Sequence, residues 1–214
     1  MVLVDARDHG QSDNPYGNGP YSVDPEIMSG DIIAVLAHAD IKQAHFWGYS
    51  MSGKIGYMVG VKAFHRLLSL IIGGAHAFVP KFDYYCMMFQ IGIDSGTLAM
   101  VNAMEKEGGQ PIEGASRENL LNSDPTALYA SVVEDNPDIA TMVGGIPGRC
   151  LLYLGDEDPN LEQASGCVNL IPQANFEVIE RADHSFGFLR EDLVFPVVAE
   201  WLTSAGSNLD YMVV

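Results

Sequence analysis

The chain has 214 residues, of which 48% are apolar and 18% charged, so it is typical of a folded globular protein and not of a disordered one. Eleven Lys and Arg against 28 Asp and Glu give a formal net charge of −17, which disfavours nucleic acid and anionic membranes as partners. No apolar run reaches the roughly 18 residues that a membrane span needs, and no basic segment followed by an apolar stretch indicates a signal peptide.

The cysteine pattern and the turns after the predicted strands give no sign of a cofactor. Three cysteines, an odd number without metal-ligand spacing, predict buried reduced thiols in a cytoplasmic protein (Cys86, Cys150 and Cys167). No Gly-rich phosphate loop or dinucleotide-binding fingerprint follows any predicted strand. We therefore expect neither a nucleotide cofactor nor a metal.

Short apolar runs alternate with helical patterns, which predicts an α/β fold with a mostly parallel sheet flanked by helices. The first strand is expected at 1–4, and the Asn-, Pro- and Gly-rich residues 14–25 are expected to form a loop. Asp24-Pro25-Glu26 is typical of a helix start, because Asp caps the helix, Pro suits its first position and Glu meets the positive end of its dipole.

The remaining core elements follow in regular order. Further strands are predicted at 44–49, 67–72, 150–154 and 176–179. Helices are predicted at 52–64, 161–170 and 189–203, and Pro196 inside the last one favours a kink.

Residues 76–148 interrupt this alternation and are too long for an ordinary connection between strands. Helical stretches near 82–106 and 116–143 predict a small helical cap inserted into a core formed by 1–75 and 149–214. The first half of the insertion is rich in Met and aromatic residues. These side chains either pack the cap onto the sheet or line an apolar acyl or alkyl pocket.

The most informative stretch surrounds Ser50, where a predicted strand runs through small residues directly into a helix. This context is typical of a nucleophile elbow, in which a strained serine sits between chain segments that pass very close to each other. Gly48 and Ser52 are small enough for the two crowded positions. The backbone amide of Met51 would open the helix and point at a developing oxyanion.

A serine nucleophile needs a base, and the base needs an acid that orients it. The turn Gly155-Asp156-Glu157-Asp158-Pro159 follows a predicted strand and offers carboxylates at the functional edge of the sheet. We expect Asp158 to be the acid. Asp156 and Glu157 are alternatives, or helpers that cap the next helix.

The loop that leaves the last strand contains His184, which we expect to be the general base and then the general acid. Its position after both the serine and the acid matches the chain order Ser, acid, His. Four other histidines lack such a context and are expected to be structural or exposed (His38, His45, His65 and His76).

Four segments together resemble the α/β-hydrolase superfamily, in its serine esterase-like branch. The opening Asp5-Ala6-Arg7-Asp8-His9-Gly10-Gln11-Ser12 resembles the Asp-x-Arg-Gly-His-Gly-x-Ser segment after that family's fourth strand, with Asp8 in place of Gly. Gly48-Tyr49-Ser50-Met51-Ser52-Gly53 resembles the elbow Gly-x-Ser-Met-Gly-Gly. Residues 155–159 resemble the acid turn Gly-Asp-x-Asp-Pro, and Ala182-Asp183-His184 resembles the catalytic histidine loop.

The resemblance implies a triad of Ser50, Asp158 and His184, and it makes 76–148 the family's cap, inserted between strands six and seven. Family members carry three strands before the segment that opens this chain, and a His-Gly loop after the third supplies the other oxyanion amide. This sequence has no such segment. We therefore expect a truncated product, or a sheet completed by a partner chain or by rearranged pairing, which makes a homodimer possible.

These observations predict a cofactor-free serine hydrolase that cleaves small apolar carboxylic esters through an acyl-enzyme. A lactone or another acyl compound would use the same residues. The alternative is a hydrolase-fold protein, or a truncated form, that binds a small ligand with little turnover. Ser50 excludes the epoxide and haloalkane hydrolases of the family, which use Asp at the elbow.

Overall fold

The computed structural model describes residues 1–7, 9–13, 24–109, 111–133, 137–184, 187, 190–204 and 212–213. Asp8, most of the loop expected at 14–25 and the first residue of the helix expected at 189–203 lie outside these described residues. The chain divides into two compact units. The first unit comprises Met1–Val4, Pro25–Val79 and Pro137–Val214, and the second comprises Asp5–Asp24 and Pro80–Asn136.

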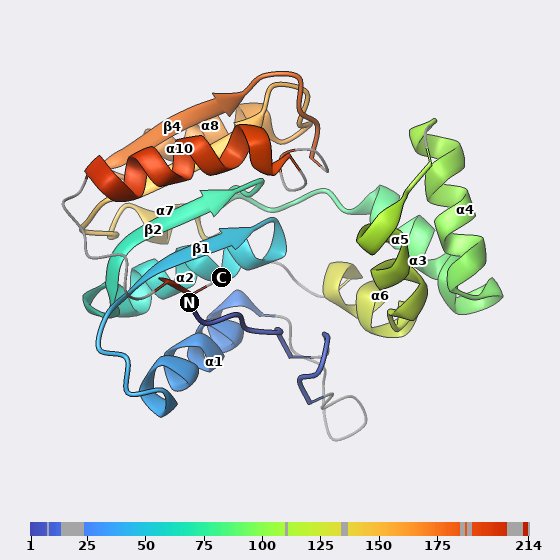
Figure 1. Ribbon diagram of the computed structural model, residues 1–214, viewed down its shortest axis with the longest axis horizontal. Helices are drawn as coiled ribbons and strands as arrows, with labels where there is room; N and C mark the ends of the chain where they lie inside the picture. The colour runs from blue at the N-terminus through green and yellow to red at the C-terminus, as the bar shows by residue number, and fades with distance from the viewer. Residues whose placement is uncertain are drawn as a thin grey trace. The chain divides into compact units, whose positions relative to one another are not determined.

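The first unit is built on a parallel sheet whose described strands run in the order β4-β3-β2-β1-β5 (Figure 1). The strands are β1 (Ala44–Tyr49), β2 (Leu67–Gly73), β3 (Cys150–Gly155), β4 (Ala174–Ile179) and β5 (Met212–Val213). The predicted α/β class with a parallel sheet is confirmed. Four of the predicted strands are present, with bounds that differ by at most two residues.

The strand expected at 1–4 is wrong. Within this segment only Val2 forms an isolated bridge, and the residues around it have no strand assignment. Directly after this segment the chain forms a turn, in which Asp5 accepts hydrogen bonds from the Gln11 amide and the Ser12 hydroxyl.

The parallel arrangement brings the carboxyl ends of the strands to one edge of the sheet. Tyr49, the last residue of β1, pairs with Gly73 of β2, and Gly73 pairs with Tyr153 of β3. Gly155, the last residue of β3, pairs with Ile179 of β4. The segments that follow β1, β3 and β4 therefore start at the same edge of the sheet, although they are far apart in the sequence.

Helices cover both faces of this sheet. The first unit contains α1 (Pro25–His38), α2 (Met51–Ala63), α7 (Ala140–Val143), α8 (Leu161–Val168), α10 (Glu191–Ser204) and the short 3-10 helix η1 (Phe64–Arg66). The start of α1 at Pro25 is the one that the sequence predicts. In Figure 1, α10 lies in front of the strands and α8 lies behind β4.

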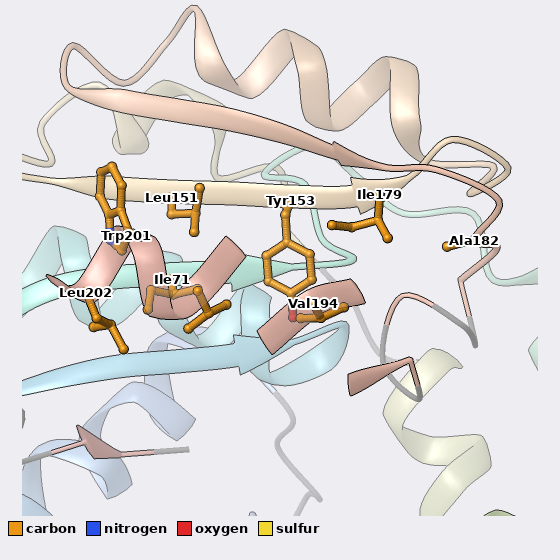
Figure 2. Packing of buried hydrophobic residues seen from close by; sticks show 9 residues of the cluster. Ile71, Leu151, Tyr153, Ile179, Ala182, Val194, Trp201 and Leu202 are labelled. Carbon is orange, nitrogen blue, oxygen red and sulfur yellow. The ribbon is translucent and has the colours of Figure 1, made fainter. Parts of the chain in front are cut away.

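Successive side chains of β2 point to opposite faces of the sheet, so they pack against two different helical layers. Ile71 belongs to a buried cluster with Leu151 and Tyr153 of β3 and Val194 and Trp201 of α10. Figure 2 shows the ring of Tyr153 pointing from β3 toward Val194. The neighbours of Ile71 in β2 face the other way, onto α2, where they lie against glycines of that helix. The core therefore holds β2 and β3 rigidly between two helical layers.

The Pro80–Asn136 segment of the second unit contains the helices α3 (Asp83–Ser95), α4 (Thr97–Gly108), α5 (Gly114–Asn122) and α6 (Pro125–Val133). Its core is a cluster around Met88, Phe89 and Met100. The two long helical stretches that the sequence predicts are each divided: Gly96, at φ 87°, separates α3 from α4, and α6 starts anew at Pro125. The Pro80–Asn136 segment of this unit is shorter at both ends than the predicted insertion 76–148, and its role as a cap stays a prediction.

Within the described residues, no helix is both long and apolar enough to cross a bilayer.

Candidate active site

Ser50 joins the end of β1 to the start of α2 in a strained backbone conformation. Its φ of 53° and ψ of −114° lie in a region that a residue with a side chain rarely adopts, at a cost of about 1–3 kcal/mol. The Ser50 amide donates to the carbonyl oxygen of Gly73 at 2.9 Å, and the Lys54 amide donates to the Ser50 carbonyl oxygen at 3.1 Å. The sheet and the helix thus hold the strained residue from both sides.

Gly48 shows why the sequence needs a residue without a side chain two positions before the serine. A Cβ atom placed on Gly48 would lie 2.5 Å from the carbonyl oxygen of Ser52 and 2.8 Å from the ring of Phe46. The chain entering the elbow therefore touches the chain leaving it, and this crowding exposes the Ser50 hydroxyl at the carboxyl edge of the sheet.

The acid turn after β3 distinguishes the three candidate carboxylates. The side chain of Asp158 is fully buried, and its Oδ1 accepts a hydrogen bond from the Asn160 amide at 2.8 Å. Asp156 and Glu157 are exposed. Asp156 Oδ1 accepts from the Ala182 amide at 3.2 Å, so this carboxylate fastens the turn to the next loop.

The turn after β3 and the loop after β4 are packed directly against each other. A Cβ atom on Gly155 would lie 1.8 Å from the carbonyl oxygen of Ala182. The Glu157 amide donates to that same oxygen at 3.0 Å. Because these contacts fix the start of the loop, His184 is carried to the side of Asp158.

The side chains of Ser50, His184 and Asp158 form one hydrogen-bonded row. The His184 Nδ1 atom lies 2.8 Å from Asp158 Oδ2, and its Nε2 atom lies 3.0 Å from Ser50 Oγ. An ionised carboxylate can only accept, so Nδ1 carries the proton and Nε2 accepts from the serine hydroxyl. The His184 side chain is 22% exposed, which leaves it accessible from solvent.

Met51 is the first residue of α2, so its N–H group has no acceptor within the helix. The N-terminus of a helix carries a partial positive charge. The amide next to Ser50 therefore lies at a place where developing negative charge on a bound carbonyl oxygen would be stabilised.

A buried polar cluster next to this row is not identified by the sequence analysis. Lys54 is only 6% exposed and donates from Nζ to the carbonyl oxygen of Phe78 at 3.3 Å. Burial lowers the pKa of Lys54 to about 8, against the opposing charge of Asp138. Nothing in the sequence marks Lys54, because a lysine in a helix ordinarily points to solvent.

His76 belongs to the same cluster. It is 6% exposed, and its side chain is hydrogen-bonded to that of Asn160, the residue whose amide binds Asp158. Burial lowers the pKa of His76, and the charge of Lys54 lowers it further, whereas Asp158 acts in the opposite direction. The environment of the acid therefore includes one buried imidazole, that of His76, and the charge of Lys54 acts on this imidazole.

A nucleophile, a base, an orienting carboxylate and a helix N-terminus at one edge of a parallel sheet can perform acyl transfer without a cofactor. Among the described residues, no group of three or more His, Cys, Asp or Glu side chains is arranged to hold a metal ion.

The sheet, its helices and the elbow define the class to which the fold belongs: the chain has the α/β-hydrolase fold, and the resemblance to this superfamily that the motifs predict is confirmed. No family model matches the chain. A curated relative is 3-oxoadipate enol-lactonase 2 of Acinetobacter baylyi, which is 26% identical over 98% of this chain and 73% of its own length.

Two solved structures are similar throughout most of the chain. The enol-lactonase from Burkholderia xenovorans is 22% identical with a TM-score of 0.78, covering 93% of this chain and 79% of its own. A thermophilic esterase from Thermogutta terrifontis is 20% identical with a TM-score of 0.75, covering 95% of this chain and 79% of its own. The names of these relatives describe hydrolases.

Proposed function

We propose that this protein is a serine hydrolase of carboxylic esters, with Ser50 as nucleophile, His184 as general base and acid, and Asp158 as orienting acid. One observation carries the proposal: the imidazole of His184 lies within hydrogen-bond distance of both other side chains. General acid–base catalysis requires this geometry, since a proton passes between donor and acceptor atoms that are about 2.6–3.2 Å apart.

In the first half of the reaction, Ser50 Oγ attacks the carbonyl carbon of the ester while its proton passes to His184 Nε2. Asp158 stabilises the resulting imidazolium through the bond at Nδ1. The Met51 amide donates to the oxyanion. When the C–O bond to the alcohol breaks, the imidazolium returns its proton to the leaving oxygen, and an acyl-enzyme remains.

In the second half, water replaces the alcohol. His184 Nε2 takes a proton from the water as the water oxygen attacks the acyl carbon. The bond to Ser50 Oγ breaks, the proton returns to that oxygen, and the carboxylic acid leaves. Each step uses the same two hydrogen bonds of the imidazole, and no redox or metal chemistry enters the cycle.

The substrate class that we propose is small and apolar at the acyl or alcohol side, with lactones included because they are cyclic esters. The similarity to proteins named enol-lactonase and esterase supports this range. The cytoplasmic location and the homodimer stay predictions. The three cysteines are free thiols, which is consistent with a reducing compartment.

The test is hydrolysis of short-chain p-nitrophenyl esters and of simple γ-lactones by the wild type and by Ser50→Ala. We expect the variant to lose at least about a thousandfold in kcat, since members of a triad act as a unit. Ser95→Ala, an exposed serine at the end of α3, is the matched control and should keep full activity. Turnover that survives in Ser50→Ala would reject Ser50 as the nucleophile.

The same samples test the alternative, a hydrolase-fold protein that binds a small ligand with little turnover. A rise in melting temperature on adding lactone or ester, with no product formed by the wild type, would favour it. Product formation that depends on Ser50 would exclude it.

A further inference from the structure

Tyr49 connects the strand that carries the nucleophile to the loop that carries the base. It is the last residue of β1, and its hydroxyl donates to the main-chain carbonyl oxygen of His184 at 2.6 Å. The two residues are 135 positions apart in the sequence. A single side chain therefore ties the backbone of His184 to the residue immediately before Ser50.

The surroundings of Tyr49 leave room for a large ring. A Cβ atom on Gly73 would lie 2.5 Å from the Tyr49 ring, and one on Gly74 would lie equally close. A Cβ atom on Gly187 would lie 2.4 Å from the Tyr49 hydroxyl. Glycines from the end of β2, from the position directly after it and from the chain beyond His184 thus enclose the phenol.

The Tyr49 ring also faces the imidazole itself. The two ring centres are 5.4 Å apart with the planes tilted by 49°. The centre of the Tyr49 ring also lies 6.0 Å from the centre of the Tyr153 ring in β3. The phenol is therefore held by the centre of the sheet and can act as a fixed support for the His184 main chain.

We propose that Tyr49 is a positioning residue that sets the place of the His184 imidazole relative to Ser50 and Asp158. The contacts at 2.8 and 3.0 Å require the His184 main chain to stay in place, because neither partner can follow a shifted ring. Ser50 is confined by the elbow, and Asp158 is fully buried. This inference rests on the proposed function for its kinetic consequence, although its geometric part is independent of it.

The experiment replaces Tyr49 by Phe, which removes one oxygen and keeps the ring. Steady-state kinetics with p-nitrophenyl acetate should show a fall of about ten- to a hundredfold in kcat with little change in KM, because the groups that bind substrate remain. The rate of labelling by a fluorophosphonate should fall by a similar factor.

Tyr153→Phe is the matched control. It also removes one phenol oxygen from a ring of the sheet, where the Tyr153 hydroxyl accepts a hydrogen bond from Trp47 Nε1 at 3.0 Å. We expect this variant to lose stability while keeping kcat within about threefold, because only a contact that reaches His184 should alter the chemistry. An equal loss of kcat in both variants, or unchanged kcat in Tyr49→Phe, would overturn the positioning role.

A second measurement separates this inference from the proposed function. Nitrogen NMR of histidine-labelled protein, with His184 assigned through His184→Gln, reports which ring nitrogen carries the proton. The wild type should show one tautomer protonated at Nδ1, and Tyr49→Phe should show averaging between orientations. A His184 signal identical in both proteins would refute the inference even if Ser50-dependent hydrolysis is found, and a change in the signal would support it even if no ester is cleaved.

Discussion

Single residues at the site are held by contacts that reach across the whole chain. Asp158 is the buried carboxylate of the acid turn. Asp156, in the same turn, accepts a hydrogen bond from the Ala182 amide and so holds the turn against the next loop. The same region contains Lys54, a buried ammonium in the first turn of α2. Burial of this charge is costly and the charge of Asp138 offsets the cost only in part, so the stability of the protein should depend on the protonation of Lys54.

The titration of Lys54 makes the free energy of unfolding depend on pH in a definite direction. Its pKa is about 8 in the folded protein, below the 10.5 of an exposed lysine. Between these values the unfolded chain binds more protons than the folded one, so the free energy of unfolding rises with pH through this window. Lys54→Met should therefore be more stable than the wild type at pH 7, and this advantage should shrink as the pH approaches 10.5.

Urea denaturation of the wild type and Lys54→Met at pH values from 7 to 10 checks this prediction. Lys62→Met removes an exposed lysine from the same helix, paired with Glu26 at 2.7 Å, and is the control for loss of a positive charge. A difference between Lys54→Met and the wild type that does not change with pH would contradict the assignment of Lys54 as a buried titrating group.

At the scale of elements, the position of α2 against the sheet decides where Ser50 lies. Gly53, Gly56 and Gly60 form the side of α2 that faces the strands, and each has sheet side chains where a Cβ atom would stand. The helix axis can therefore approach the sheet more closely than larger residues would allow. Close approach keeps the first turn of α2 directly behind the nucleophile.

Gly56→Ala tests this packing. Its new Cβ would lie 2.7 Å from the Phe46 ring, so we expect a loss of about 1–3 kcal/mol in the free energy of unfolding. Gly30→Ala, in the middle of α1 with open space around it, should instead gain up to about 1 kcal/mol because alanine favours the helix. Chemical denaturation of both variants gives the comparison, and equal effects would mean that the α2 contact does not govern the packing.

The elements that could be predicted from the sequence are those with a strong local signal. The strand at 150–154 is an uninterrupted apolar run, and the start at Pro25 combines a cap, a proline and an acidic first turn. The divided helices of the second unit were missed, because the apolar helical pattern continues on both sides of Gly96 and Pro125. Asp124-Pro125 nevertheless has the same cap and proline as the start of α1, and the Asp124 carboxylate does accept a hydrogen bond from the Thr126 amide at 2.8 Å.

In the candidate site, too, some residues could be predicted from the sequence and others could not. Ser50, Asp158 and His184 could be named because each stands in a recognisable turn after a predicted strand, although their catalytic role stays a prediction. The contact of Tyr49 with His184 and the burial of Lys54 could not be predicted, because both depend on segments that meet only in the folded protein. Local periodicity contains no information about such contacts.

At the scale of the whole molecule, the chain combines an α/β-hydrolase core with a helical unit and a formal net charge of −17. This charge repels polyanions and is compatible with the small apolar substrates that we propose. The sheet of the core is parallel in all its described strand pairs. It places the three residues of the proposed triad within the first unit, so their geometry is set by a single packed core.

The His184–Asp158 pair should activate Ser50 as a nucleophile, and covalent labelling reports this activation without any choice of substrate. The folded protein is treated with a fluorophosphonate, digested, and mapped by mass spectrometry. We expect one phosphonyl adduct, on the peptide that contains Ser50, which is absent in Ser50→Ala and forms far more slowly in His184→Gln. A folded wild type that acquires no adduct, or acquires it on another residue, would show that Ser50 is not the activated nucleophile.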